Sequence, residues 1–145
     1  MKYFLFTLIC LALLSCSQPE KNKATHTAIK ATPQDIKNDT LRNYLFLKDM
    51  YSDSYFPKFL VDKGKAILVD LCLQIENEQP KNLEDLYKLT HAATEKFNDL
   101  EKVFDANGSE IETAARESIA ADFEFIAHTY GYKADVEELI APRNW

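Results

Sequence analysis

Glycine, cysteine and tryptophan are scarce in this chain of 145 residues, which contains three glycines, three cysteines and one tryptophan. Gly64, Gly108 and Gly131 stand far apart, so the chain has no Gly-rich loop of the kind that cradles phosphates. A Cys-x-x-Cys pair, a Ser/His/Asp arrangement and a paired-carboxylate motif are also missing. The sequence therefore identifies no reaction, and we expect no cofactor.

The N-terminus carries a targeting signal. Its apolar run, Phe4 to Leu14, follows Lys2 and is too short to span a bilayer. The run ends in Leu-Leu-Ser-Cys, which resembles the lipobox of bacterial lipoproteins, where cleavage precedes the cysteine and the cysteine receives the lipid. We predict that residues 1–15 are a lipoprotein signal peptide and that Cys16 is the lipidated residue. An ordinary secretory signal with an incidental cysteine is the alternative.

The position after this cysteine is Ser17 and not the aspartate that retains enterobacterial lipoproteins in the inner membrane. The predicted location is the cell envelope, with the lipid in the outer membrane and the protein facing the periplasm. Because Cys10 leaves with the signal and Cys16 is acylated, only Cys72 remains and no internal disulfide is expected. Cys72 falls in an apolar run, which favours a buried structural thiol.

Charge divides the mature chain. Residues 17–38 are polar, with four lysines against two acidic residues, and predict a flexible tether. Residues 39–145 contain 12 Lys and Arg against 21 Asp and Glu, a net charge of −9, and predict the folded domain. An acidic domain argues against nucleic acid as a partner, so contact with the membrane is expected through the lipid alone.

The strongest structural pattern runs from Asn82 to Gly131 and predicts two long helices joined at Asn107-Gly108-Ser109. Apolar residues recur every three or four positions in both. Asn82 suits an N-cap, Gly108 and Gly131 suit helix ends, and Ser109 with Glu112 fits a capping box. We expect the two helices to pack antiparallel.

Three further segments have helical patterns. A short helix is predicted from Asp39 to about Met50, an apolar helix from Pro57 to about Asn77, and a last helix over Tyr132–Ile140. A strand at Ala66–Leu73 is the alternative within the second segment. Gly64 lies on its apolar face and predicts a close helix crossing. The expected fold is all-α, a small bundle of four to five helices built on an antiparallel helical hairpin.

Two sets of residues could form a binding site. One is an aromatic and acidic rim between the first two helices, containing Tyr51, Asp53 and Tyr55; rings that simply plug the end of the bundle are the other interpretation. The second set consists of polar positions on the two long helices, where an inward Asp122 near Arg116 or Thr94 would form a hydrogen-bonded network. Its members are Thr90, His91, Thr94, Glu95, Arg116 and Asp122.

A metal site is a weaker hypothesis. His91 and Glu95 are four residues apart on one long helix, and Glu124 and His128 are four apart on the other. An antiparallel hairpin would bring both pairs to one level, where they could bind zinc. Their spacing differs from the Glu-x-x-His motif of bundle metal sites, so two surface pairs are the default interpretation.

From about residue 41 to the end, the chain resembles an uncharacterised bacterial family, known only as a domain of unknown function. The resemblance implies a small helical domain and supplies no catalytic residue. It is carried by these segments: Met50–Pro57, Lys58–Lys63, Leu89–Glu95, Glu110–Glu117, Asp122–Ala127 and Ala134–Ile140.

Three functions are compatible with the sequence. The leading hypothesis is a lipid-anchored binding module for a protein partner, in one form an immunity or inhibitor protein whose acidic face meets a basic effector. The second is a metal-binding or hydrolytic helical domain that uses the histidine and glutamate pairs. The third is a structural lipoprotein of the envelope.

Overall fold

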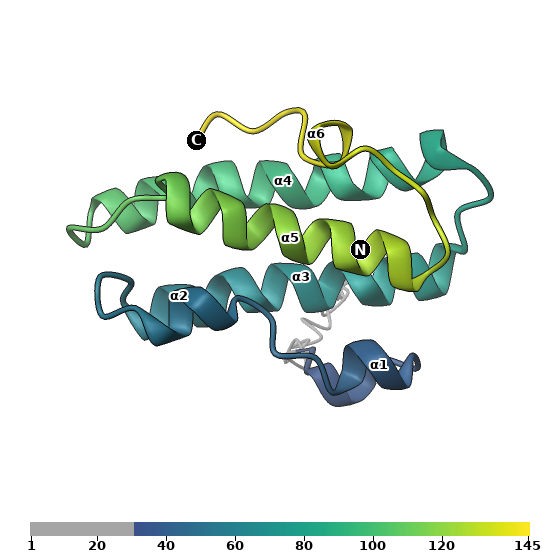
Figure 1. The fold of residues 1–145 in the computed structure, drawn as a ribbon, viewed down its shortest axis with the longest axis horizontal. Coiled ribbons are helices and arrows are strands. Elements are labelled where there is room, and N and C mark those ends of the chain that lie inside the picture. The colour runs from purple at the N-terminus through teal and green to yellow at the C-terminus, as the bar shows by residue number, and fades with distance from the viewer. Residues whose placement is uncertain (1–30) are drawn as a thin grey trace, which may run out of the picture.

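The structure, a computed structural model, describes residues 31–145, where all the regular secondary structure is helical (Figure 1). The predicted all-α class is therefore confirmed. The signal peptide, the lipid site at Cys16 and most of the expected tether lie outside the described residues. A 3-10 turn at Pro33–Asp35 precedes six helices: α1 (Asp39–Arg42), α2 (Lys48–Ser52), α3 (Lys58–Glu78), α4 (Leu83–Asp105), α5 (Thr113–Thr129) and α6 (Val136–Leu139).

The three long helices lie side by side and alternate in direction, so α4 is antiparallel to both α3 and α5 (Figure 1). The most extensive helix pair is α3 with α4. Gly64 explains this close approach, because a Cβ there would lie 2.9 Å from Leu47 Cδ1 and 3.2 Å from Phe97 Cε1. Across the other pair, the rings of Phe97 and Phe123 lie 6.1 Å apart. The predicted crossing at Gly64 is confirmed.

The turn between α4 and α5 ends α4 as predicted but begins α5 at a different residue. Gly108 adopts a positive φ of 73° and ends α4, and the Ser109 N–H donates to Phe104 O at 3.1 Å, as in a Schellman ending. Ser109 was expected to begin the next helix, but α5 begins at Thr113 with Glu112 in the cap position. The capping-box prediction is wrong because the Ser109 backbone completes the preceding helix.

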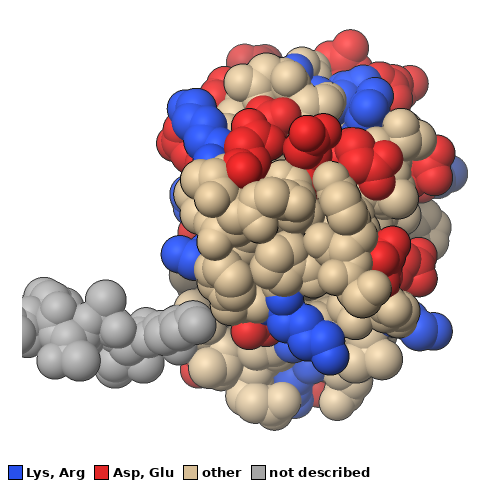
Figure 2. Space-filling view, turned by 90° about the vertical axis from the view of Figure 1, so that its left-hand side faces the viewer, with Lys and Arg blue, Asp and Glu red and all other residues tan. Residues whose placement is uncertain are grey.

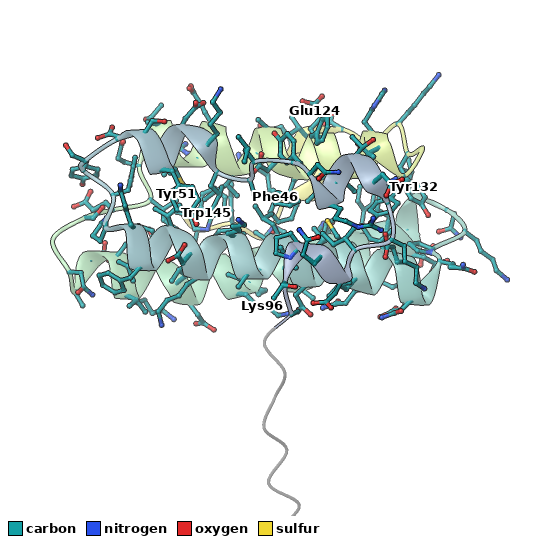
Figure 3. The ribbon with its side chains drawn as sticks, turned by 90° about the horizontal axis from the view of Figure 1, so that it is seen from below. Phe46, Tyr51, Lys96, Glu124, Tyr132 and Trp145 are labelled. Atoms are coloured by element: carbon teal, nitrogen blue, oxygen red, sulfur yellow. The ribbon has the colours of Figure 1, made fainter. Side chains whose placement is uncertain are left out.

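The helix expected from Asp39 to Met50 is two helices, α1 and α2, separated by residues 43–47. Leu47 has a positive φ of 53°, which breaks a helix, and its side chain is 1% exposed. Phe46 is equally buried and lies between the helices (Figure 3). The predicted continuous helix is therefore wrong, because tertiary contacts fix a conformation that leucine by itself disfavours.

The folded part also starts before residue 39. Ile36 is fully buried, and the N–H groups of Lys37 and Asn38 donate to the two carboxylate oxygens of Glu76 at 2.9 and 2.8 Å. The tether was expected to extend to Asn38, whereas residues 31–38 lie against α3. A segment with few apolar residues can still pack on the domain when its backbone N–H groups donate to a side chain there, as these do to Glu76.

The C-terminal segment crosses α4 and α5. Its helix, α6, is shorter than the predicted Tyr132–Ile140 and begins after Asp135, whose carboxylate accepts the Glu137 N–H. Trp145 packs back on the domain, with its ring 6.3 Å from that of Phe97. None of the helices in residues 31–145 is long and apolar enough to cross a membrane.

Candidate functional site

The residues proposed for a metal site are not assembled into one. Nε2 of His91 lies 2.7 Å from Glu138 O, and Glu95 accepts a hydrogen bond from Asn98. Glu124 lies at the outer edge of α5 (Figure 3). Among residues 31–145, no three His, Cys, Asp or Glu side chains are placed to hold a metal ion. Within the described part of the chain, His91, Glu95, Glu124 and His128 are therefore not grouped as the metal site that their spacing allowed.

The inward threonines of α4 are bonded within their own helix. The hydroxyl of Thr94 donates to Thr90 O at 2.9 Å, and that of Thr90 donates to Tyr87 O at 3.3 Å. Both side chains are buried. The predicted network from Asp122 to Thr94 or Arg116 is wrong, because the hydrogen bonds to Asp122 come from another part of the chain.

The aromatic rim is partly occupied by internal contacts. Tyr51 donates to Asp62 Oδ1 at 2.6 Å, and Asp53 Oδ1 accepts the Tyr55 N–H at 2.8 Å. Phe56 is buried against Phe104, with 6.4 Å between ring centroids, and so plugs this end of the bundle. Tyr55 keeps 44% of its surface exposed, so its role in recognition remains a prediction.

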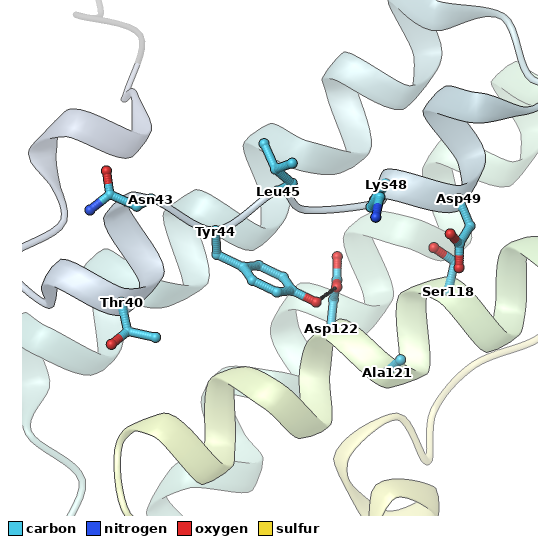
Figure 4. A pocket seen from close by; sticks show the side chains of 9 residues that line it. All are labelled: Thr40, Asn43, Tyr44, Leu45, Lys48, Asp49, Ser118, Ala121 and Asp122. Carbon is cyan, nitrogen blue, oxygen red and sulfur yellow. Dashed lines mark hydrogen bonds between the residues drawn. The ribbon is translucent and has the colours of Figure 1, made fainter.

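Asp122 is the one predicted site residue with an unusual environment. Its side chain, on the buried face of α5, is 3% exposed. Oδ1 accepts the Tyr44 hydroxyl at 2.9 Å (Figure 4), and Oδ2 accepts the Leu47 N–H at 2.7 Å. These donors belong to the connection between α1 and α2. The carboxylate therefore fastens that connection to α5.

A hollow of about 450 Å³ opens beside this carboxylate, between the α1–α2 connection and α5. Its lining combines both charges, hydroxyls and one large apolar side chain, Leu45, which is 65% exposed. Figure 4 shows these side chains, which are Thr40, Asn43, Tyr44, Leu45, Lys48, Asp49, Ser118, Ala121 and Asp122.

A model of the family of unknown function DUF5713 matches residues 40–145, which include the whole of this hollow. The chain belongs to this family. The expected resemblance to a family without an assigned reaction is thus confirmed, whereas a bacterial origin and a lipoprotein signal remain predictions for this DUF5713 protein. No protein of curated function matches the chain, and no solved structure does.

Burial dominates the chemistry of Asp122 in this DUF5713 domain. It raises the pKa of the carboxyl to about 6, against the lowering effect of the hydrogen bonds from Leu47 and Tyr44, and the negative charge of Asp49 adds to the rise. Burial and the Asp122 charge also raise the pKa of Tyr44 to about 12. Asp122 therefore keeps its proton to a higher pH than an ordinary aspartate does.

A ligand in the hollow would meet exposed side chains and not the carboxylate itself. Leu45, Lys48 and Asp49 are exposed, whereas Asp122 is covered by the chain that it binds. The arrangement suits a surface contact better than proton transfer to a substrate, because a general acid or base must reach the reacting atom.

Sequence reasoning missed two residues that organise this region, Tyr44 and Leu47. Tyr44 was assigned to a helix, although Asn43 before it could have indicated a break in that helix. The hydroxyl of a buried tyrosine usually needs a hydrogen-bond partner, which could have indicated a contact with a polar residue elsewhere. Nothing in the sequence marks Leu47, because leucine rarely takes a positive φ. Glu76 was also missed, although it binds two backbone N–H groups and the Tyr130 hydroxyl.

Proposed function

We propose that this DUF5713 protein is an acidic interaction module, held at a membrane by a lipid on Cys16, that binds a positively charged protein partner. An immunity or inhibitor protein directed against a basic effector is one form of this function. The proposed location is the bacterial cell envelope, with the domain in the periplasm.

The charge of the folded domain carries the proposal. Residues 31–145 contain 13 Lys and Arg against 22 Asp and Glu, a net charge of −9 on the helical bundle. Charge of one sign steers a partner of opposite charge and selects against partners of the same charge. Acidic residues gather on the end of the bundle shown in Figure 2, above a wide uncharged area.

Exposed apolar side chains support a contact with protein. Phe59 is 53% exposed and Tyr55 is 44% exposed, both near the start of α3, and Val103 near the end of α4 is 37% exposed. Because α3 and α4 are antiparallel, these positions lie toward the same end of the bundle. Aromatic side chains are enriched in protein interfaces, where a polar rim surrounds them.

The test is recovery of a partner from the native envelope. The lipidated protein, purified in detergent, is immobilised and exposed to envelope extract at low salt, and bound proteins are identified. We expect a basic protein to be retained at low salt and released as the ionic strength rises, because screening weakens charge attraction. The proposal is abandoned if nothing specific is retained at low salt.

A further inference from the structure

A second hollow, of about 550 Å³, lies at the end of the bundle where α4 turns toward α5. This is the end seen in Figure 2. Its volume is within the range of about 300–1,000 Å³ typical of ligand pockets. We call it the turn hollow and define it by the polar and aromatic residues of its lining, which are Glu101, Asp105, Ser109, Glu110, Glu112 and Trp145.

Four of these residues are acidic, and the two that complete the lining, Gly108 and Ile111, are uncharged. Burial and the charges of Asp105 and Glu110 raise the pKa of Glu101, although Lys102 partly opposes the rise. Lys102 is itself paired with Asp99 at 2.9 Å, on the exposed side of α4. The carboxylates of the turn hollow therefore repel one another, and a bound cation would relieve this repulsion.

The same hollow contains polar atoms that have no partner. Ser109 is 1% exposed, and its Oγ accepts and donates no hydrogen bond within residues 31–145. Nε1 of Trp145 is also buried and unpaired in that range. An unpaired buried donor costs about 1–3 kcal/mol, so a rotation of either side chain that brought its donor to an acceptor group of a ligand would be favourable.

We propose that the turn hollow binds an arginine of the partner protein, an inference that rests on the proposed function and names its site. The guanidinium group pairs with Glu101, Asp105 and Glu110. A backbone carbonyl beside that arginine accepts hydrogen bonds from Ser109 or Trp145. The planar guanidinium suits this hollow because it binds several carboxylates at once and tolerates contact with an indole ring.

The turn hollow provides its own reporter, because Trp145 is the single tryptophan of the chain. The lipidated full-length protein in detergent is titrated with N-acetylargininamide while tryptophan fluorescence is recorded. N-acetylcitrullinamide, a neutral molecule of nearly the same shape, is the matched ligand control. We expect a saturable change with the arginine derivative and at least about tenfold weaker binding of the citrulline derivative.

Two isosteric double variants locate the binding. Glu101→Gln with Glu110→Gln removes two charges from the turn hollow and should weaken binding of the arginine derivative about tenfold. Glu78→Gln with Glu124→Gln removes two charges from exposed positions on other elements and should leave the affinity unchanged. Circular dichroism melting of each variant checks that the fold is intact.

The inference is overturned if the arginine derivative produces no saturable change, if the citrulline derivative binds equally well, or if both double variants weaken binding equally. It is also overturned if the Glu101/Glu110 variant retains the envelope partner as well as the unaltered protein does; a partner would then bind elsewhere and the proposed function would stand. Failure of the unaltered protein to retain any partner would instead remove the proposed function.

Discussion

At the scale of single residues, the fate of each buried polar group depends on which donors reach it. Thr90 and Thr94 bond to carbonyls one turn away on their own helix. Asp122 bonds to Tyr44 and Leu47, more than 70 positions away in the sequence. Its inward position followed from helical periodicity, but its partners depend on how α2 lies on α5. The buried carboxylate also makes stability depend on pH.

We expect Asp122→Asn to remove this dependence. The folded pKa of about 6 exceeds the ordinary value of 3.8, so the folded protein holds the proton more tightly than the unfolded chain between those pH values. The contribution of Asp122 to the free energy of unfolding is therefore fully present below the unfolded pKa of 3.8 and is lost as the pH rises through the folded pKa of about 6. Relative to the variant, the unaltered protein should lose about 2 kcal/mol between pH 4 and pH 7.

Urea denaturation of both proteins at pH 4 and pH 7 provides the measurement. Glu124→Gln, an exposed change on the same helix, is the control and should show no such pH-dependent difference. A difference between the Asp122 variant and the unaltered protein that stays constant with pH would contradict the assignment of a raised pKa.

At the scale of helices, the long elements were predictable and the short ones were not. The apolar pattern placed α3 within about one residue of its bounds, and Asn82 caps α4 by accepting the Asp85 N–H at 2.9 Å, as expected. In contrast, α1 and α2 are too short for a periodic pattern to identify. Their boundary depends on Leu47, whose side chain contacts the position where a Gly64 Cβ would lie.

Gly64→Ala should destabilise the protein. Alanine favours a helix by about 1 kcal/mol over glycine, but the added Cβ would come within 2.9 Å of Leu47 and 3.2 Å of Phe97, both fully buried. Overpacking typically costs about 1–3 kcal/mol, so the net change in unfolding free energy should be a loss of about 0–2 kcal/mol.

Asn77→Ala, an exposed change near the end of the same helix, is the control and should be neutral or slightly stabilising. Urea denaturation of both variants measures the difference. A Gly64 variant at least as stable as the Asn77 variant would show that α3 and α4 can separate or repack at no cost.

At the scale of the whole molecule, two carboxylates join the N-terminal part of the domain to the long helices. Glu76 on α3 binds the backbone of Lys37 and Asn38, and Asp122 on α5 binds the backbone of Leu47. The segment that follows the expected tether is therefore fixed to two different helices.

Cys16→Ser tests the anchor. If the lipid is attached to Cys16, the variant should move from the membrane fraction to the soluble fraction of the cell. Without acyl chains, the protein has nothing buried in the bilayer. Cys10→Ser lies within the predicted signal peptide and is the matched control, which should remain in the membrane fraction. Immunoblots of fractionated cells measure both.

A Cys16 variant that stays with the membrane, also after a high-salt wash, would contradict lipid attachment at this residue. Release of the Cys10 variant into the soluble fraction would mean that membrane attachment depends on the signal peptide as a whole and not on the lipid site alone. Either result would leave the helical domain unchanged and would alter the proposed location.

The sequence by itself determined the helical class, the long helices and the glycine endings of α4 and α5, since periodicity and backbone preference are local properties. It also determined the acidic charge and the burial of Cys72, which is fully buried. Burial raises the pKa of that thiol to about 12.

The tertiary structure alone decided the break at Leu47, the attachment of residues 31–38, the partners of Asp122 and the turn hollow at Ser109 and Trp145. Each depends on contacts between residues distant in the sequence, which no local pattern encodes. The physical reason is the same in every case. A buried polar group or a strained backbone is stable only when a particular neighbour reaches it, and packing chooses that neighbour.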